Sequence, residues 1–175
     1  MLRRLFCIFA ALICLSGGAS AEIYSDWVRL HVVAEGDNAY QQALKLEIRD
    51  ECLKYAAACL SDASDADAAY MRLEDHLAEF EEAARRRASE LGYAGSIRAE
   101  TGTFSFPDRI YGGVLVPAGE YRALRVTIGG GEGHNWWCVL YPTLCFGDEA
   151  AFAAEEMPQR RGLFFELFEK WRADR

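Results

Sequence analysis

The sequence lacks the signatures of several common protein classes. Its glycine-rich stretch GGGEGHNWW has His134 and Asn135 where a phosphate-binding loop has lysine and then serine or threonine. No C-x-x-C pair is present to hold zinc tightly, and no apolar run reaches the roughly 20 residues of a membrane-spanning helix. Internal repeats and long low-complexity segments are also missing, so the composition indicates one globular domain.

Basic residues are scarce. Lys and Arg number 19 against 27 Asp and Glu, which gives a net charge of −8 at pH 7. The densest basic stretch, RRRASE at 85–90, directly follows EFEEAA and is typical of a solvated helix surface. An acidic surface repels phosphate backbones and anionic lipid. We therefore expect no nucleic-acid partner.

The first 21 residues follow the plan of a secretory signal peptide. In MLRRLFCIFAALICLSGGASA, Arg3 and Arg4 precede the apolar run at 5–15, and Ala19-Ser20-Ala21 forms an A-x-A cleavage site. Cleavage would leave a mature chain that begins at Glu22 and carries 17 basic and 27 acidic residues, a net charge of −10. The sequence thus predicts an exported protein.

Two periodicities alternate along the mature chain. Apolar residues at steps of three and four predict amphipathic helices, and Asn38 with Gln41 has the spacing of a capping box at the first of them. Alternation with a period of two predicts strands. The expected helices are 38–59, 65–91 and 160–171, and the expected strands are 25–35, 97–101, 120–129 and 136–141.

This order, β-α-α-β-β-β with a C-terminal helix, predicts an α+β fold in which a helical pair covers an antiparallel sheet. We divide the chain into a signal peptide at 1–21, an α+β domain at 22–147 and a helical tail at 148–175. The glycines at 129–133 are expected to form a flexible turn that uses positive φ angles.

Four cysteines remain after the signal peptide. Cys52 and Cys59 lie seven residues apart on the inward stripe of a helix, about 10 Å, which is beyond disulfide reach. Cys138 and Cys145 bracket a segment that contains Pro142 and that is expected to turn the chain. Export permits oxidation, so we predict a disulfide between Cys138 and Cys145.

Catalytic and metal-binding interpretations find little support. Within a strand, His134 and Cys138 lie about 13 Å apart, too far for a nucleophile and its base. His134, Cys138 and Cys145 supply only three soft metal ligands. We expect no catalytic residue, no metal and no cofactor, and a secreted Cys/His hydrolase that acts on the cell envelope remains the alternative.

Trp136 and Trp137 form the most unusual pair in the chain. Neighbouring residues on a strand face opposite sides of the sheet, so only one of the two indoles can point into the core. The other must contact a second element or a partner, and tryptophan is a favoured anchor of protein interfaces. Burial of both indoles within the domain is the competing interpretation.

Several motifs resemble one known family. VRLHVVAEGDNAYQQALKLEIRD, FPDRIYGG and VPAGEYRALRVTIGGGEGHNWWCVLYPTLCF are similar, in the same order, to segments of stage II sporulation protein R of endospore-forming bacteria. The similarity extends over about 28–146. The residues on family positions are Arg29, His31, Gln42, Lys45, Arg49, Asp50, Asn135, Trp136, Trp137, Cys138 and Cys145.

The resemblance implies a signalling protein rather than an enzyme. Members are made in the forespore and exported into the space between forespore and mother cell. There they activate a membrane-embedded aspartic protease of the mother cell, which cleaves the precursor of sigma factor E. This role implies no small-molecule substrate.

A recognition surface for that protease is expected at the glycine loop and the residues that follow it. Loops on a rigid sheet commonly carry recognition, and no other part of the acidic surface offers a comparable aromatic anchor. The candidate contact residues are Gly131, Asn135, Trp136 and Trp137, with Arg49 and Asp50 of the first helix next in order.

The signal peptide can be tested directly. Because the leader has its basic, apolar and cleavage regions in order, N-terminal sequencing of exported protein is expected to read Glu-Ile-Tyr from Glu22. Recovery of a full-length, membrane-retained product would contradict cleavage and would indicate an anchor.

Overall fold

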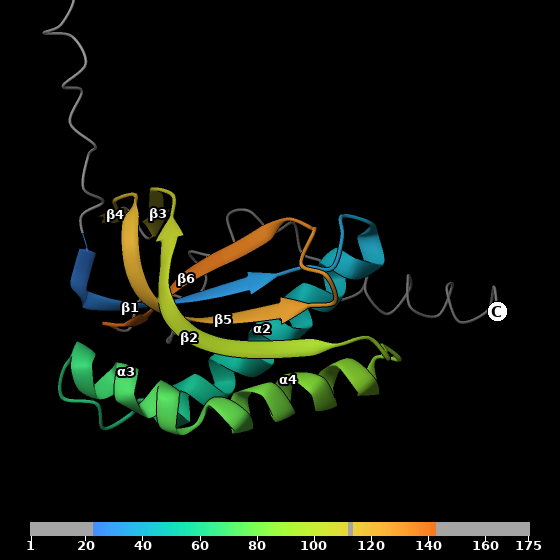
Figure 1. Cartoon of the computed structure of the whole chain (residues 1–175), viewed down its shortest axis with the longest axis horizontal. Helices are drawn as coiled ribbons and strands as arrows, with labels where there is room; N and C mark the ends of the chain where they lie inside the picture. The colour runs from blue at the N-terminus through green and yellow to red at the C-terminus, as the bar shows by residue number, and fades with distance from the viewer. Residues whose placement is uncertain (1–22, 112–113, 143–175) are drawn as a thin grey trace, which may run out of the picture.

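Strand β1 (Ile23–Val33) lies inside a four-stranded sheet of order β2-β5-β1-β6 (Figure 1). The computed structural model describes residues 23–111 and 114–142, so the leader, Cys145 and the tail helix lie outside the described residues. The other strands of this sheet are β2 (Ile97–Phe106), β5 (Gly119–Ile128) and β6 (Asn135–Tyr141). The predicted α+β class is confirmed.

One pairing differs from the expected antiparallel sheet. β1 pairs with β6, and β2 with β5, in antiparallel fashion, but β1 and β5 run parallel. Neighbouring parallel strands need a long crossover, and here all three described helices and β2 lie between them in the chain. The local alternation that identifies a strand carries no information about its direction in the sheet.

Three helices pack on one face of the sheet. They are α2 (Ala39–Cys59), α3 (Ala66–Asp75) and α4 (Leu77–Glu90). The predicted capping box at the start of α2 is present, because Asn38 accepts a hydrogen bond from the Gln41 backbone N–H and the Gln41 side chain accepts one from the Asn38 backbone. No helix in the described part of the chain is long and apolar enough to cross a membrane.

The second expected helix is broken at His76. The sequence predicted one helix over 65–91, but His76 leaves helical geometry at φ −108° and ψ 20° and separates α3 from α4. The break redirects the chain, so that α3 packs on β1 while α4 packs on α2 and β2. No glycine or proline marks this position, which is why the sequence pattern did not reveal it.

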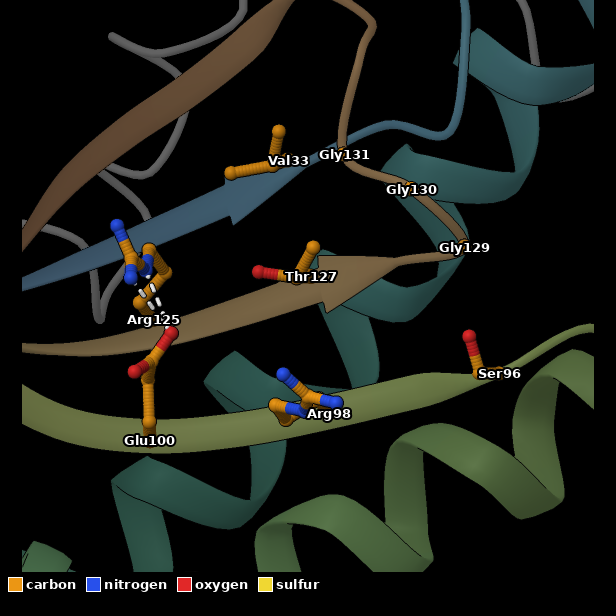
Figure 2. A pocket seen from close by; sticks show the side chains of 9 residues that line it. All are labelled: Val33, Ser96, Arg98, Glu100, Arg125, Thr127, Gly129, Gly130 and Gly131. Carbon is orange, nitrogen blue, oxygen red and sulfur yellow. Dashed lines mark hydrogen bonds and ion pairs between the residues drawn. The ribbon is translucent and has the colours of Figure 1, made fainter.

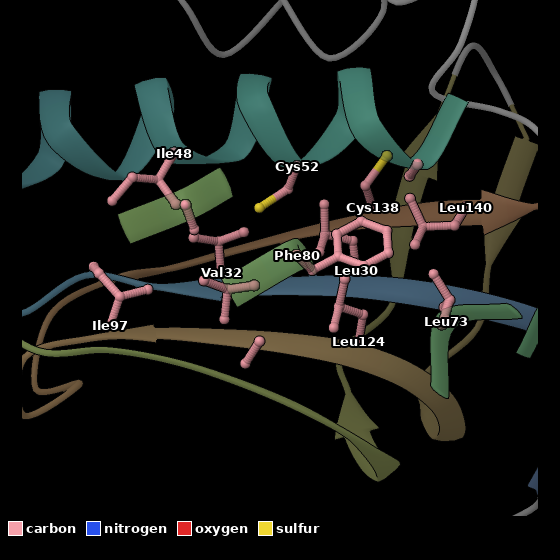
Figure 3. Packing of buried hydrophobic residues seen from close by; sticks show 14 of the residues in the cluster. Leu30, Val32, Ile48, Cys52, Leu73, Phe80, Ile97, Leu124, Cys138 and Leu140 are labelled. Carbon is pink, nitrogen blue, oxygen red and sulfur yellow. The ribbon is translucent and has the colours of Figure 1, made fainter. Parts of the chain in front are cut away.

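The main core lies between these helices and the sheet (Figure 3). Alternate residues of β1 enter it, while α2 contributes Ile48 and Cys52, and α4 contributes Phe80. All of these side chains are fully or almost fully buried. Cys59 is partly buried against the same core.

The opposite face of the sheet, here called the far face, has a smaller cluster. β3 (Arg109–Tyr111) and β4 (Val114–Val116) form a separate antiparallel hairpin at one end of the sheet (Figure 1). Neither strand is among those expected from the sequence. The cluster consists of Phe106, Val116, Tyr121, Ala123 and Val139, with Tyr24, Trp27, Phe104, Tyr111 and Trp137 partly buried around it.

Candidate functional site

The glycine loop between β5 and β6 is closely packed against the start of α2. Gly129 and Gly131 have positive φ angles of 56° and 67°, as the glycine run predicted. The Gly133 N–H donates to the Ala34 carbonyl at 2.9 Å. A Cβ on Gly133 would lie 2.5 Å from the Gly36 carbonyl oxygen, so only glycine allows this approach.

Polar side chains of α2 fix the same loop. Lys45 Nζ donates to the His134 carbonyl at 3.0 Å and to Gln42 Oε1 at 2.7 Å. Asp37 Oδ1 accepts a hydrogen bond from the His134 backbone N–H at 2.6 Å, which lowers the pKa of the Asp37 carboxyl group. The loop is therefore held from two directions, in contrast to the flexible loop that its glycine content indicated.

Trp136 lies on the helix side of β6. Its half-buried ring packs against the main core, and the Arg49 guanidinium carbon lies 5.0 Å from the ring centroid. Arg49 Nη2 also pairs with the Asp50 carboxylate at 2.6 Å. Three of the predicted contact residues thus form one group at the side of α2.

Trp137 lies on the far face, as strand alternation predicts. Its ring is stacked with the His31 imidazole at 5.9 Å between centroids, and the Arg109 guanidinium carbon lies 4.5 Å from the indole centroid. Asn135 shares this face, with Oδ1 2.8 Å from His31 Nε2. The six predicted contact residues therefore do not form one patch, because the sheet separates the Trp136 group from Asn135 and Trp137.

His31 is a half-buried hydrogen-bonding group on the far face. Burial lowers the pKa of its imidazole below the ordinary value, and the nearby positive charge of Arg125 lowers it further. With Nε2 facing Asn135, the buried Nδ1 has no hydrogen-bond partner. His31 was marked from the sequence as a family position within an expected strand, and it lies in β1.

Arg29 is the most heavily buried cation of the described chain. Its side chain is 0% exposed, and burial lowers its pKa. Nε donates to the Cys138 carbonyl at 3.2 Å, and Nη2 donates to the Tyr111 hydroxyl at 2.7 Å. The guanidinium carbon lies 4.1 Å from the Phe106 ring centroid. Hydrogen bonds and aromatic rings stabilise this charge, and no carboxylate in the described part of the chain pairs with it.

A hollow of about 340 Å³ lies on the far face beside the glycine loop (Figure 2). Arg98, Glu100 and Arg125 supply its charged lining, and Gly131 lies at its rim. Sequence reasoning missed this site. The alternation of Arg125 and Thr127 with apolar residues in β5 was the available signal, because it placed polar groups on the face away from the helices.

The described cysteines are poorly suited to nucleophilic chemistry. Cys138 is disulfide-bonded and fully buried, whereas Cys52 and Cys59 are free thiols. Burial raises the pKa of the Cys52 thiol to about 12 and also raises that of Cys59, so neither is a thiolate at neutral pH. Cys145 lies outside the described residues, and its pairing with Cys138 stays a prediction.

Within 23–111 and 114–142, no three His, Cys, Asp or Glu residues are placed to hold a metal ion. The polar groups gather instead on the far face and around β6. The fold and this arrangement define a small α+β domain with arginine, aromatic and amide side chains on both faces of the sheet; of these, arginine and aromatic residues are the types enriched in protein interfaces.

Comparison with known proteins identifies the family. The model of the family described as stage II sporulation protein R matches residues 24–151, so the chain belongs to this family. Stage II sporulation protein R of Bacillus subtilis (strain 168) is 37% identical over 121 residues, which are 69% of this chain and 54% of that protein. The chain spans about half the length of this curated relative. No solved structure matches.

The Tyr111 hydroxyl provides a test of the buried charge. Tyr111→Phe removes the acceptor of Arg29 Nη2 and also the donor to the Trp137 carbonyl. Loss of the hydrogen bond to the charged group alone is expected to lower the free energy of unfolding by about 1.5–3 kcal/mol. Urea denaturation measures this change. Tyr55→Phe is the control, because no described residue accepts a hydrogen bond from the Tyr55 hydroxyl.

In an Arg29→Met background, Tyr111→Phe should lower the free energy of unfolding by clearly less, since no buried charge is then left unpaired. Equal losses in both backgrounds would contradict the assigned role of Tyr111.

The thiols provide a second test. We expect a non-reducing digest to yield a peptide pair linked through Cys138 and Cys145, with Cys52 and Cys59 recovered as alkylated thiols. A loop this short stabilises the fold by on the order of 2–3 kcal/mol in the chain-entropy model. Mass spectrometry that finds Cys138 linked to Cys52 or Cys59 would disprove the pairing.

Proposed function

We propose that this protein is the exported signal that activates a membrane-embedded aspartic protease during sporulation. In this proposal the forespore secretes it across its membrane into the intermembrane space, and the mother-cell protease then cleaves the precursor of sigma factor E. The observation that carries the proposal is membership in the stage II sporulation protein R family over 24–151.

The amino-terminal sequence supports the proposed location. Arg3 and Arg4, the apolar run at 5–15 and the A-x-A site form a complete signal-peptide pattern. An oxidised Cys138 is also consistent with export, because disulfides persist in oxidising compartments outside the cytosol.

The thiol chemistry favours a signal over the alternative, a secreted Cys/His hydrolase. Such an enzyme needs an accessible thiolate next to a histidine. Cys138 is fully buried with its sulfur in a disulfide, and the raised pKa values of Cys52 and Cys59 keep them protonated. A protein that acts by binding requires none of these groups to react.

The far-face end of β6 is the proposed contact with the protease. Asn135 is exposed, and the half-buried Trp137 ring lies between His31 and Arg109. Gly131 and the hollow lie beside them. Trp136, Arg49 and Asp50 lie on the other face of the sheet and form the second candidate contact.

Reconstitution tests the function. The chain is co-produced with the candidate protease and the sigma-factor precursor, and precursor cleavage is followed by immunoblotting. Cleavage is expected only when all three are present. Cleavage that is independent of this chain, or hydrolytic turnover by the purified protein that disappears in Cys138→Ser, would refute the signalling role.

Single substitutions then locate the contact. Asn135→Ala is expected to retain the melting temperature and to lose processing. Trp137→Ala is expected to lose processing with a smaller drop in melting temperature than Trp136→Ala, because its ring packs against the smaller far-face cluster, and truncation of an interface tryptophan costs about 2 kcal/mol or more, roughly thirtyfold in affinity. Trp136→Ala should instead lower the melting temperature, because its ring packs against the main core.

Both quantities are measured on the same samples. If every variant that loses processing also melts early, the contact lies elsewhere, and Arg49→Ala and Asp50→Ala are tested next.

A further inference from the structure

The hollow on the far face contains a cation without an ion pair to a described residue. Arg98 lines the hollow and makes no ion pair or hydrogen bond with another described residue (Figure 2). It acts on the fold through a longer-range attraction, which adds to the hydrogen bond from the Ala99 N–H in lowering the pKa of Glu81. By contrast, the arginines of α4 and Arg122 each pair with a carboxylate. A guanidinium group offers five N–H donors in a planar fork that matches a carboxylate. Arg98 therefore leaves this capacity available to a ligand.

Arg125 supplies a second, fixed cation on the neighbouring strand. Glu100 Oε1 accepts hydrogen bonds from Arg125 Nε at 2.8 Å and pairs with Nη2 at 2.7 Å. The Arg125 guanidinium carbon also lies 4.2 Å from the Phe104 ring centroid. These two contacts set the orientation of the guanidinium group before any ligand enters. The lining thus has two cations and one carboxylate, in a protein with a net charge of −8.

The rest of the lining suits a short hydrocarbon stem. Val33 and Thr127 lie beneath Gly131, since a Cβ there would be 2.7 Å from Thr127 Cγ2 and 3.5 Å from Val33 Cγ1. The methyl groups of these two residues can contact methylene groups, while the Ser96 and Thr127 hydroxyls can donate hydrogen bonds. A carboxylate on two methylene groups combines these requirements.

Gly130 belongs to the lining of the hollow. Unlike Gly129 and Gly131, it has no positive φ angle. A Cβ on Gly130 would meet only atoms of Glu132, at 3.6 Å or more, which is ordinary contact. Neither backbone conformation nor close packing requires glycine here, so a larger side chain at this lining position tests access to the hollow without straining the backbone.

We propose that this hollow binds a glutamate side chain of an acidic peptide segment in a protein partner. The carboxylate pairs with Arg98 and lies next to Arg125, and its methylene groups lie over Val33 and Thr127. Glu100 and Glu132 border the site, and the whole chain is acidic, so phosphate or an anionic membrane is repelled more strongly than a single carboxylate. The inference stands apart from the signalling role, because binding is measured on the purified protein alone.

The probe is the peptide acetyl-Gly-Glu-Gly-amide, with acetyl-Gly-Gln-Gly-amide as its uncharged match. The backbone amide signals of 129–131 and the Arg98 Nε signal are followed by ¹⁵N NMR on the full chain. The glutamate peptide is expected to shift these signals saturably, and the glutamine peptide is expected to leave them in place.

Two substitutions sharpen the test. Arg98→Gln should weaken binding at least tenfold, whereas Lys54→Gln, which removes an exposed charge from α2, should leave it unchanged. Gly130→Val should also weaken binding at least tenfold while the melting temperature is retained.

The proposal is overturned by any of three results. The first is equal shifts with both peptides, and the second is unchanged binding by Arg98→Gln. The third is that inorganic phosphate or phosphatidylglycerol vesicles shift these signals while the glutamate peptide does not.

Discussion

The buried guanidinium of Arg29 constrains one end of the sheet. Removing an ion of this size from water costs several kcal/mol, and the cost is met only if its donors and its charge find partners. Here the partners come from four segments: the Cys138 carbonyl, the Tyr111 hydroxyl and the rings of Phe106 and Tyr121, the last at 4.9 Å. Nη1 has no hydrogen-bond partner among the described residues, so the aromatic rings are its main compensation. The β3–β4 hairpin can therefore be understood as the cover that this charge requires, since it provides Tyr111.

Strand β6 joins the segments that the family resemblance had marked. Residues far apart in sequence meet along it in pairs: Arg29 with Cys138, His31 with Asn135, Lys45 with His134, and Arg49 with Trp136. Three of these pairs link β1 or α2 to the seven-residue strand itself, and Lys45 holds His134, the residue directly before it. A substitution in one member would thus act on the position of β6, and through it on both faces of the sheet.

The local patterns predicted most of the elements and part of the site. Apolar periodicity identified α2 and the inward stripe with Cys52, and alternation placed Trp136 and Trp137 on opposite sides. The parallel pairing of β1 with β5 and the break at His76 were not predictable, because both depend on contacts between segments far apart in sequence. The hollow was missed for the same reason: Arg98 and Arg125 become neighbours only through the register of β2 on β5.

Charge on this protein acts in opposite directions at long and short range. Most described arginines are paired with adjacent acids, for example Arg87 with Glu47 and Glu90, and such exposed pairs contribute little to stability. These pairs also cancel positive charge locally, so the net charge of the surface stays negative and repels an acidic partner. In physiological salt, ions largely screen this repulsion beyond about 8–10 Å. Attraction begins only at contact distance, where Arg98 lacks such a partner. Selectivity at the far face must then come from fit within the hollow rather than from electrostatic steering.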